Sequence, residues 1–367
     1  MNKKKSYKPD WAPADGGDEF AVNIKKGVTP IINSEIKNIS KYEPSINEYV
    51  EGVLNNRRTL LAKTITLIES NSEKHFKQAN KIIQKLLPEA GKSIRVGITG
   101  VPGAGKSTFI EALGLYLINK GHKVAVLTVD PSSSISKGSI LGDKTRMEKL
   151  SREPNCFIRP SPAGSTLGGV TRKSRETITI CEAAGYDVIL IETVGVGQNE
   201  ITVRAMVDFF LLLLIPGAGD ELQGIKRGVV EIADTLLINK ADGDNKSRAE
   251  IAKNEYSSAL HYLKPKIEGW ITPVETCSAI GGKGIEEFWS LVLEFVSLTK
   301  KTGYFENNRA EQSKKWFYSL IDEKLKSNFF NDSLITEMLP NFEKDIINNE
   351  LFVIEAVEEL FSKYKKR

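Results

Sequence analysis

Gly100-Val-Pro-Gly-Ala-Gly-Lys-Ser-Thr108 matches the pattern G-x-x-x-x-G-K-[ST], which is typical of a phosphate-binding P-loop. The apolar run Ile94–Thr99 precedes it and predicts a strand, and Ser107–Lys120 predicts a helix. Glycines in such a loop let backbone N–H groups point inward around phosphates, and the helix N-terminus adds its positive end. We therefore expect the phosphates of a nucleotide to bind at Gly100, Val101, Pro102, Gly103, Ala104, Gly105, Lys106, Ser107 and Thr108.

Short apolar runs recur along the middle of the chain. Besides the run before the P-loop, they are Val124–Val129, Val188–Thr193, Phe209–Ile215, Thr235–Asn239 and Ile271–Thr276. Segments of helical character separate them, namely Arg172–Ala184, Gly224–Ile232, Ser247–Leu263 and Ile285–Leu298. Continuous apolar runs that alternate with helices indicate a parallel sheet covered on both faces. The sequence therefore predicts an α/β fold for residues 93–300, a P-loop NTPase with a mostly parallel sheet flanked by helices.

The segments on either side of this domain have a different character. Residues 1–45 are polar and rich in Lys, Asn, Pro and Gly, so we expect a weakly ordered extension. Residues 46–92 carry apolar positions at helical spacing and predict an N-terminal helical segment, with one helix over Lys74–Leu87. Residues 301–367 are dense in Lys and Glu and predict helices only.

Composition bounds the class of protein. The chain of 367 residues is 40% hydrophobic and 27% charged, which is typical of a globular protein with a sizeable core. Its net charge of +4 is too small to indicate nucleic-acid or membrane binding by itself. The three cysteines lie far apart without C-x-x-C spacing, and no apolar stretch approaches about 18 residues. We expect a cytoplasmic protein, without a disulfide framework, that binds neither nucleic acid nor membrane.

Acidic side chains follow two of the predicted strands, where a P-loop protein would hold Mg²⁺. Asp130 ends the second apolar run, and Asp143 lies in the loop beyond. Glu192 ends the apolar strand that follows, in the manner of a Walker-B acid. We expect Ser107, Asp130 and Asp143 to bind Mg²⁺ directly or through water, and Glu192 to act through a magnesium-bound water. The alternative for Asp130 and Asp143 is a solvated acid in a turn.

The residues after Glu192 suggest how hydrolysis could be organised. Gly195 would present its N–H to the γ-phosphate and let the following loop move after hydrolysis. Gln198, or a nearby backbone group, would position the attacking water. Together with Lys106, which reaches the β- and γ-phosphates, these residues form the expected catalytic set of Lys106, Glu192, Gly195 and Gln198. An exposed glutamine without a role is the alternative for Gln198.

The sequence also predicts which base is bound. Asn239-Lys-Ala-Asp242 ends an apolar strand and matches the N-K-x-D signature of guanine-specific GTPases. Asp242 can accept hydrogen bonds from guanine N1–H and N2, and adenine lacks both donors. Asn239 can contact guanine or tie this loop to the P-loop, and Lys240 can lie along the base. After the last strand, backbone N–H groups are expected to face guanine O6, at Ser278, Ala279 and Ile280.

Several segments carry a resemblance to a known family. The chain resembles the MeaB/ArgK family of SIMIBI-class GTPases, which includes the human methylmalonic aciduria type A protein. The resemblance covers roughly residues 50–300. The matching segments are Arg57-Arg58 with Ile65–Glu69, Gly100–Thr108, Asp130–Ser133, Gly138–Met147, Ser161–Gly169, Glu192–Gln198, Pro216–Lys226 and Asn239–Asp242.

This resemblance implies a function. Family members are GTP-dependent chaperones of an adenosylcobalamin-dependent acyl-CoA mutase, usually methylmalonyl-CoA mutase, and they gate cofactor loading and protect or reactivate the mutase. The implied cofactors are Mg²⁺ and bound GTP or GDP, without a tightly bound cobalamin. Two alternatives remain open: related GTPases deliver nickel or other metals during enzyme maturation, and an older interpretation of this family is a transport-associated kinase.

Two further expectations concern partners. The loop Gly217–Gly228 follows a buried strand and should emerge at the nucleotide edge of the sheet. In the resembled family this segment is a third switch that relays the nucleotide state to the mutase, which here implies Asp220, Glu221, Gln223 and Lys226. The C-terminal helices carry more apolar positions than a two-helix tail can cover, among them Trp316, Phe317, Leu320 and Ile321. We expect a C-terminal dimerisation arm and a homodimer; the alternative is that these residues cover their own domain.

Overall fold

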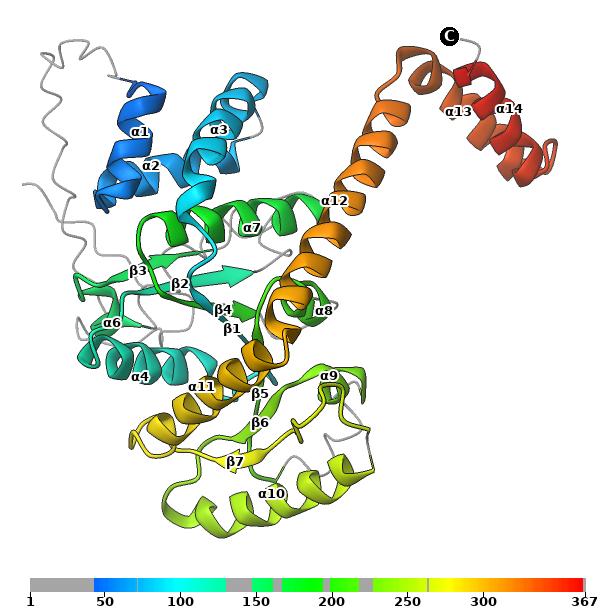
Figure 1. The fold of residues 1–367 in the computed structure, drawn as a ribbon. Helices are drawn as coiled ribbons and strands as arrows, with labels where there is room; N and C mark the ends of the chain where they lie inside the picture. The colour runs from blue at the N-terminus through cyan, green and yellow to red at the C-terminus, as the bar shows by residue number, and fades with distance from the viewer. Residues whose placement is uncertain are drawn as a thin grey trace, which may run out of the picture. The chain divides into compact units, whose positions relative to one another are not determined.

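The computed structural model describes residues 43–70, 72–129, 147–160, 167–193, 199–217, 227–262 and 264–365. The chain divides into two units, Met1–Pro44 and Ser45–Arg367, and every element named below belongs to the second. Strands and helices alternate along the chain from β1 to α11, with further helices before and after them, as Figure 1 shows.

The strands of the described residues form one parallel sheet. Its order is β3-β2-β4-β1-β5-β6-β7, and every neighbouring pair is parallel. The predicted α/β fold is therefore confirmed. The strands are β1 (Ile94–Gly100), β2 (Val124–Val129), β3 (Cys156–Arg159), β4 (Val188–Thr193), β5 (Phe209–Leu214), β6 (Thr235–Ile238) and β7 (Val274–Thr276).

Two details of the sheet differ from the sequence-based expectation. β3 was not predicted, because its four residues are too few to stand out from the surrounding polar segment. β7 begins at Val274 and not at Ile271, whose side chain is 79% exposed. The apolar run Ile271–Thr276 therefore overestimated the length of this edge strand.

The sheet is buried on both faces, which explains why its strands read as continuous apolar runs. In β4, Ile189 and Ile191 belong to one hydrophobic cluster, while Val188 and Leu190 belong to the other. The second cluster lies under α4 (Lys106–Asn119), α6 (Glu148–Ser151) and α11 (Ile285–Lys301). The first lies under α7 (Leu167–Ala183), α8 (Asn199–Arg204), α9 (Arg227–Ile232) and α10 (Lys246–His261).

Three N-terminal helices form a layer over α7. They are α1 (Ile46–Leu54), α2 (Arg58–Glu69) and α3 (Glu73–Leu86). A capping box closes the start of α1, where the Ser45 hydroxyl accepts from Glu48 N–H and the Glu48 carboxylate accepts from Ser45 N–H. Gly52 allows α2 to approach, since a Cβ there would lie 2.3 Å from Leu60 Cδ1. The Arg159–Glu69 ion pair joins this layer to β3.

The C-terminal part is helical, as predicted, throughout its described residues. It contains α12 (Tyr304–Phe330), α13 (Ser333–Ile347) and α14 (Val353–Lys365). Gly303, with φ of 73°, separates α11 from α12, and Asp332 caps α13. Helices α13 and α14 enclose a small core of their own, formed by Ile335, Phe342, Ala356 and Leu360. Among the described helices, none has the length and apolar character that a membrane span requires.

Candidate functional site

The P-loop lies between β1 and α4. β1 ends at Gly100 and α4 begins at Lys106. Gly100 has no room for a side chain, because a Cβ there would lie 2.2 Å from the carbonyl oxygen of Leu213 on β5. Gly103 and Gly105 have φ angles of 78° and 85°, which non-glycine residues rarely adopt. The glycines of the motif thus meet steric and backbone requirements of the turn.

Lys106 points back into this loop. Its Nζ donates to the carbonyl oxygen of Gly100 at 2.8 Å and to that of Val101 at 3.4 Å. Burial lowers the pKa of Lys106, while the negative charges of Glu192 and Glu200 raise it. The ammonium therefore donates to two carbonyl groups of the loop, and phosphate oxygens would replace these acceptors in the predicted nucleotide complex.

Glu192 and Ser107 meet beside the P-loop. The Ser107 hydroxyl donates to Glu192 Oε1 at 3.2 Å, and Glu192 is only 7% exposed at the end of β4. The next residue, Thr193, donates to Thr99 Oγ1 at 2.8 Å and joins the ends of β4 and β1. A hydroxyl and a carboxylate oxygen are the ligands that Mg²⁺ prefers, so this donor set fits the ion.

Eight of the predicted site residues lie outside the described residues. For the magnesium site they are Asp130 and Asp143, and for the hydrolytic loop Gly195 and Gln198. For the third switch they are Asp220, Glu221, Gln223 and Lys226.

Asn239 connects the guanine motif to the P-loop. Its Nδ2 donates to the carbonyl oxygen of Ala104 at 2.8 Å, and its side chain is buried. Its Oδ1 accepts from the backbone N–H of Ala279 at 3.1 Å and from the Cys277 thiol at 3.4 Å. At Gly105 a Cβ would lie 2.8 Å from Asn239 Nδ2. One buried amide therefore holds three segments together that lie far apart in the sequence.

Asp242 lies at the same edge of the sheet and contacts the loop that follows β7. The Ser278 hydroxyl donates to Asp242 Oδ2, and Ser278 itself is buried. Lys240 has a φ of 60° although it is not glycine, which turns the chain sharply between Asn239 and Asp242. Lys240 and Ile280 are both exposed.

The loop after β7 makes internal bonds that the sequence did not indicate. Ser278 N–H donates to the carbonyl oxygen of Lys283, and Ala279 N–H donates to Asn239. Two of the three N–H groups expected to face guanine O6 therefore have partners inside the protein. Thr99, Thr193 and Cys277 were not singled out from the sequence; their position at the ends of predicted strands was the one available signal.

The structure thus brings the P-loop, Glu192 and the Asn239–Asp242 loop together at the carboxyl ends of β1, β4 and β6. A family model described as methylmalonyl Co-A mutase-associated GTPase MeaB matches residues 61–333. The chain belongs to the MeaB family. The predicted resemblance is confirmed, and the family is one of P-loop GTPases.

Named relatives agree with this assignment. GTPase ArgK of Escherichia coli is 45% identical over 288 residues, which are 78% of this chain and 87% of the relative. The mitochondrial methylmalonic aciduria type A homolog of Mus musculus is 44% identical over 337 residues, or 89% of this chain and 81% of the relative. A crystal structure named LAO/AO transport system kinase has a TM-score of 0.71 and 36% identity, covering 89% of this chain and 99% of that one.

Proposed function

We propose that this MeaB-family chain binds and hydrolyses GTP with Mg²⁺. In this proposal hydrolysis gates the loading of adenosylcobalamin onto an acyl-CoA mutase, namely methylmalonyl-CoA mutase, and protects or reactivates that mutase. The family description and the names of the relatives support the partner. The observation that carries the nucleotide part is the contact of Asn239 with Ala104, because it holds a guanine-reading loop against a phosphate-binding loop.

Each residue of the site has a part in this proposal. Asp242, oriented by Ser278, accepts from the guanine base, and Lys106 stabilises charge on the β- and γ-phosphates. Ser107, Asp130 and Asp143 would bind Mg²⁺ directly or through water, and Glu192 would act through a magnesium-bound water. When bound, Mg²⁺ neutralises negative charge on the phosphates. Gly195 binds the γ-phosphate through its N–H, and Gln198 orients the attacking water.

The third-switch residues provide a test of the link to the mutase. Lys226→Ala and Asp220→Ala should leave GTP affinity and basal turnover nearly unchanged, with basal turnover below about 1 s⁻¹ because no arginine finger is placed by motif. Both changes should blunt the stimulation of turnover by methylmalonyl-CoA mutase, since these residues are proposed to contact the partner. The measurement is phosphate release with and without the mutase.

Lys246→Ala, at an exposed lysine that begins α10, is the matched control for charge removal. It should be stimulated as fully as the wild type. If Lys226→Ala and Asp220→Ala also respond fully, and cofactor loading still depends on nucleotide, the loop is not the relay.

The same assay separates the two alternatives. A metal-delivery GTPase would ignore the mutase and respond to nickel and a nickel-enzyme precursor. A transport-associated kinase, as the solved relative is named, would transfer the γ-phosphate to a protein acceptor. Release of inorganic phosphate that the mutase stimulates, without label transfer to protein, favours the mutase chaperone.

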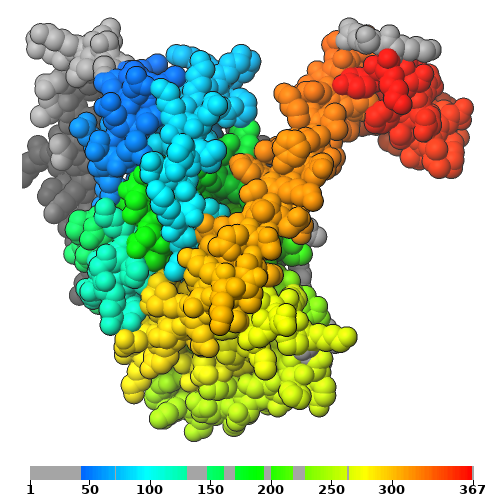
Figure 2. All heavy atoms as spheres, in the orientation of Figure 1, coloured from blue at the N-terminus to red at the C-terminus, as the bar shows by residue number. Residues whose placement is uncertain are grey.

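We also propose that the C-terminal helices form a homodimer. Apolar side chains on α12 are exposed in the single chain, among them Phe317 (59%), Tyr318 (56%) and Leu325 (62%). Figure 2 shows α12, in orange, continuing beyond the sheet domain toward α13 and α14. Trp316 is different, because its ring packs on Arg175 of the same chain. A face of this kind is typical of an interface between chains.

Light scattering at micromolar concentration should give twice the chain mass of 40.7 kDa. The double variant Phe317→Glu/Leu325→Glu should shift the mass to that of one chain, since it places two charges on the apolar face. Glu323→Lys, an exposed change on the same helix, should leave the mass doubled. A monomeric wild type would show that these residues serve another purpose.

A further inference from the structure

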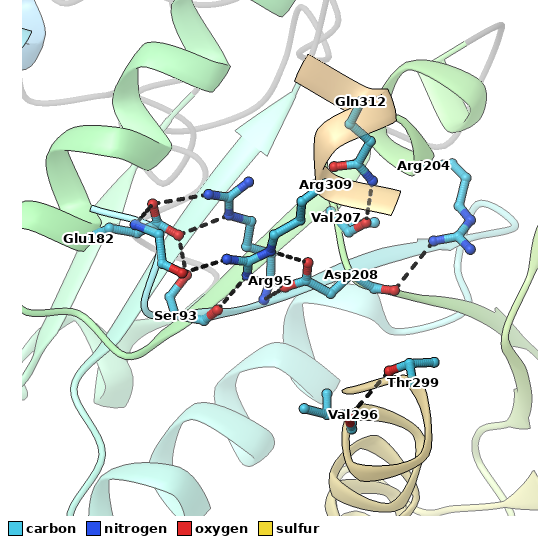
Figure 3. A network of polar contacts seen from close by, with 11 residues as sticks. Ser93, Arg95, Glu182, Arg204, Val207, Asp208, Val296, Thr299, Arg309 and Gln312 are labelled. Carbon is cyan, nitrogen blue, oxygen red and sulfur yellow. Dashed lines mark hydrogen bonds and ion pairs between the residues drawn. The ribbon is translucent and has the colours of Figure 1, made fainter. Parts of the chain in front are cut away.

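The first turns of α12 are fastened to the amino-terminal edge of the sheet. Arg309 forms a two-pronged ion pair with Asp208, with Nε–Oδ1 at 2.7 Å and Nη2–Oδ2 at 2.6 Å. The same guanidinium donates to the carbonyl oxygen of Ser93 (Figure 3). It also donates to the carbonyl oxygen of Gly91. The Asp208 side chain is 1% exposed and that of Arg309 is 15% exposed, so the pair is shielded from water. The two parallel bonds also fix the orientation of the guanidinium relative to the carboxylate.

The next residues on the same face of α12 continue this contact. Gln312 is 6% exposed, and its Nε2 donates to the carbonyl oxygen of Val207 at 2.8 Å. Trp316, one turn further, lies 5.5 Å from the guanidinium of Arg175, which itself donates to the carbonyl oxygen of Ala205. Residues 205–208 are therefore held by α12 on one side and by α7 on the other.

Residues 205–208 follow α8 directly, and α8 connects them to the nucleotide site. Val203 is fully buried against β1, where a Cβ at Gly97 would lie 3.0 Å from Val203 Cγ1. At the end of α8, Arg204 donates to the carbonyl oxygen of Asp208 and to the carboxylate of Asp234. α8 also packs against β4, at whose end Glu192 contacts Ser107 of the P-loop. One short helix thus connects the strands that end at the nucleotide site with the residues that contact α12.

Unpaired polar atoms gather at this junction. Within the described residues, the buried side-chain atoms without a hydrogen-bond partner include Arg175 Nε, Gln312 Oε1 and Trp316 Nε1. Buried polar groups are normally paired. A small displacement of α12 over residues 205–208 would therefore change which of these atoms have partners, and a second arrangement would not have to lose hydrogen bonds overall.

We propose that the α8–α12 junction, defined as residues 204–208 with Arg175, Arg309, Gln312 and Trp316, couples the nucleotide site to the C-terminal helices. In this inference, which rests on the proposed GTP function, α8 takes different positions with GTP and GDP and carries residues 205–208 with it. The Arg309–Asp208 pair and the Gln312–Val207 bond then transmit this movement and change the position of α12. A ligand can drive such a change only if it binds the two arrangements differently, and bound GTP and GDP supply that difference.

Hydrogen–deuterium exchange of the full-length chain tests this coupling. Residues 304–320 should exchange at different rates with GDP·Mg²⁺ and with a non-hydrolysable GTP analogue and Mg²⁺. The expected difference is about 2- to 30-fold, which corresponds to coupling energies typical of such networks. Gln312→Met, which keeps the volume and removes the bond to Val207, should abolish most of the difference while the variant still binds GDP and the GTP analogue.

Arg309→Lys is the second variant, because it keeps the positive charge and loses the two-pronged geometry. Thermal unfolding of both variants establishes that they are folded. Lys314→Ala is the matched control, since it breaks an exposed pair with Glu311 on the same helix. It should retain the full nucleotide-dependent difference.

The outcomes distinguish the junction from the proposed function. If the wild type binds no guanine nucleotide, the proposed function is wrong, and the proposed coupling is then wrong as well. If nucleotide binds but residues 304–320 exchange equally in both states, the coupling alone is wrong. If folded Gln312→Met and Arg309→Lys both keep the wild-type difference, the junction does not carry it.

Discussion

Asp242→Asn is expected to lower the affinity for GTP by roughly 100-fold or more, because two hydrogen bonds to a carboxylate, worth about 1.5–3 kcal/mol each, are lost or reversed. The amide can accept from N1–H but turns a donor toward the N2 amine of guanine. Xanthine carries a carbonyl at that position, so the variant should bind xanthosine triphosphate better than the wild type does. Titration with fluorescent nucleotides measures all three affinities.

The wild type should prefer GTP over ATP by at least about 100-fold, since adenine would leave the Asp242 carboxylate without its partners. Asp244→Asn is the matched control, because Asp244 is an exposed acid two residues further along the same loop. It should bind GTP as the wild type does. Equal affinity of the wild type for ATP and GTP would contradict the assignment of this loop.

Lys106→Ala should reduce the rate of GTP hydrolysis by about 100- to 1000-fold, because a positive charge aimed at the transferring phosphate is removed. Lys106 lies among the carbonyls of Gly100 and Val101, within the loop that would surround the phosphates. Single-turnover phosphate release at saturating GTP measures the effect separately from weakened binding.

Lys120→Ala is the matched control for this change. Lys120 follows the last residue of α4, the helix that Lys106 begins, and its side chain is exposed. The control should hydrolyse GTP at the wild-type rate. Lys106→Arg keeps the charge but replaces a compact ammonium by a planar guanidinium, so it should remain impaired. Hydrolysis by Lys106→Ala at the wild-type rate would remove Lys106 from the proposed catalytic set.

The proposed coupling gives α12 two roles within one helix. Its first turns contact residues 205–208, and its middle carries the apolar side chains of the proposed dimer interface. A change in the contacts of Arg309 and Gln312 with residues 205–208 would therefore alter the position of that interface. Nucleotide state, assembly and partner binding would then be linked through the same element, as allosteric coupling requires.

The sequence by itself determined the features that depend on local pattern. Apolar runs predicted six of the strands, because all of these except the edge strand β7 are largely buried on both faces and admit few polar residues. The P-loop was recognisable because its glycines meet requirements of the turn itself, as the 2.2 Å approach of Leu213 to a Cβ at Gly100 illustrates. The N-K-x-D signature similarly predicted a guanine site from four consecutive residues.

Only the tertiary structure decided how distant residues meet. The bond from Asn239 to Ala104 joins positions 135 residues apart, and the Arg309–Asp208 pair joins positions 101 residues apart. No periodicity connects such positions, since they become neighbours only when helices pack on the sheet. α8 and β3 were missed for a related reason: six and four residues are too short for a pattern, and packing against β1 and β2 stabilises them.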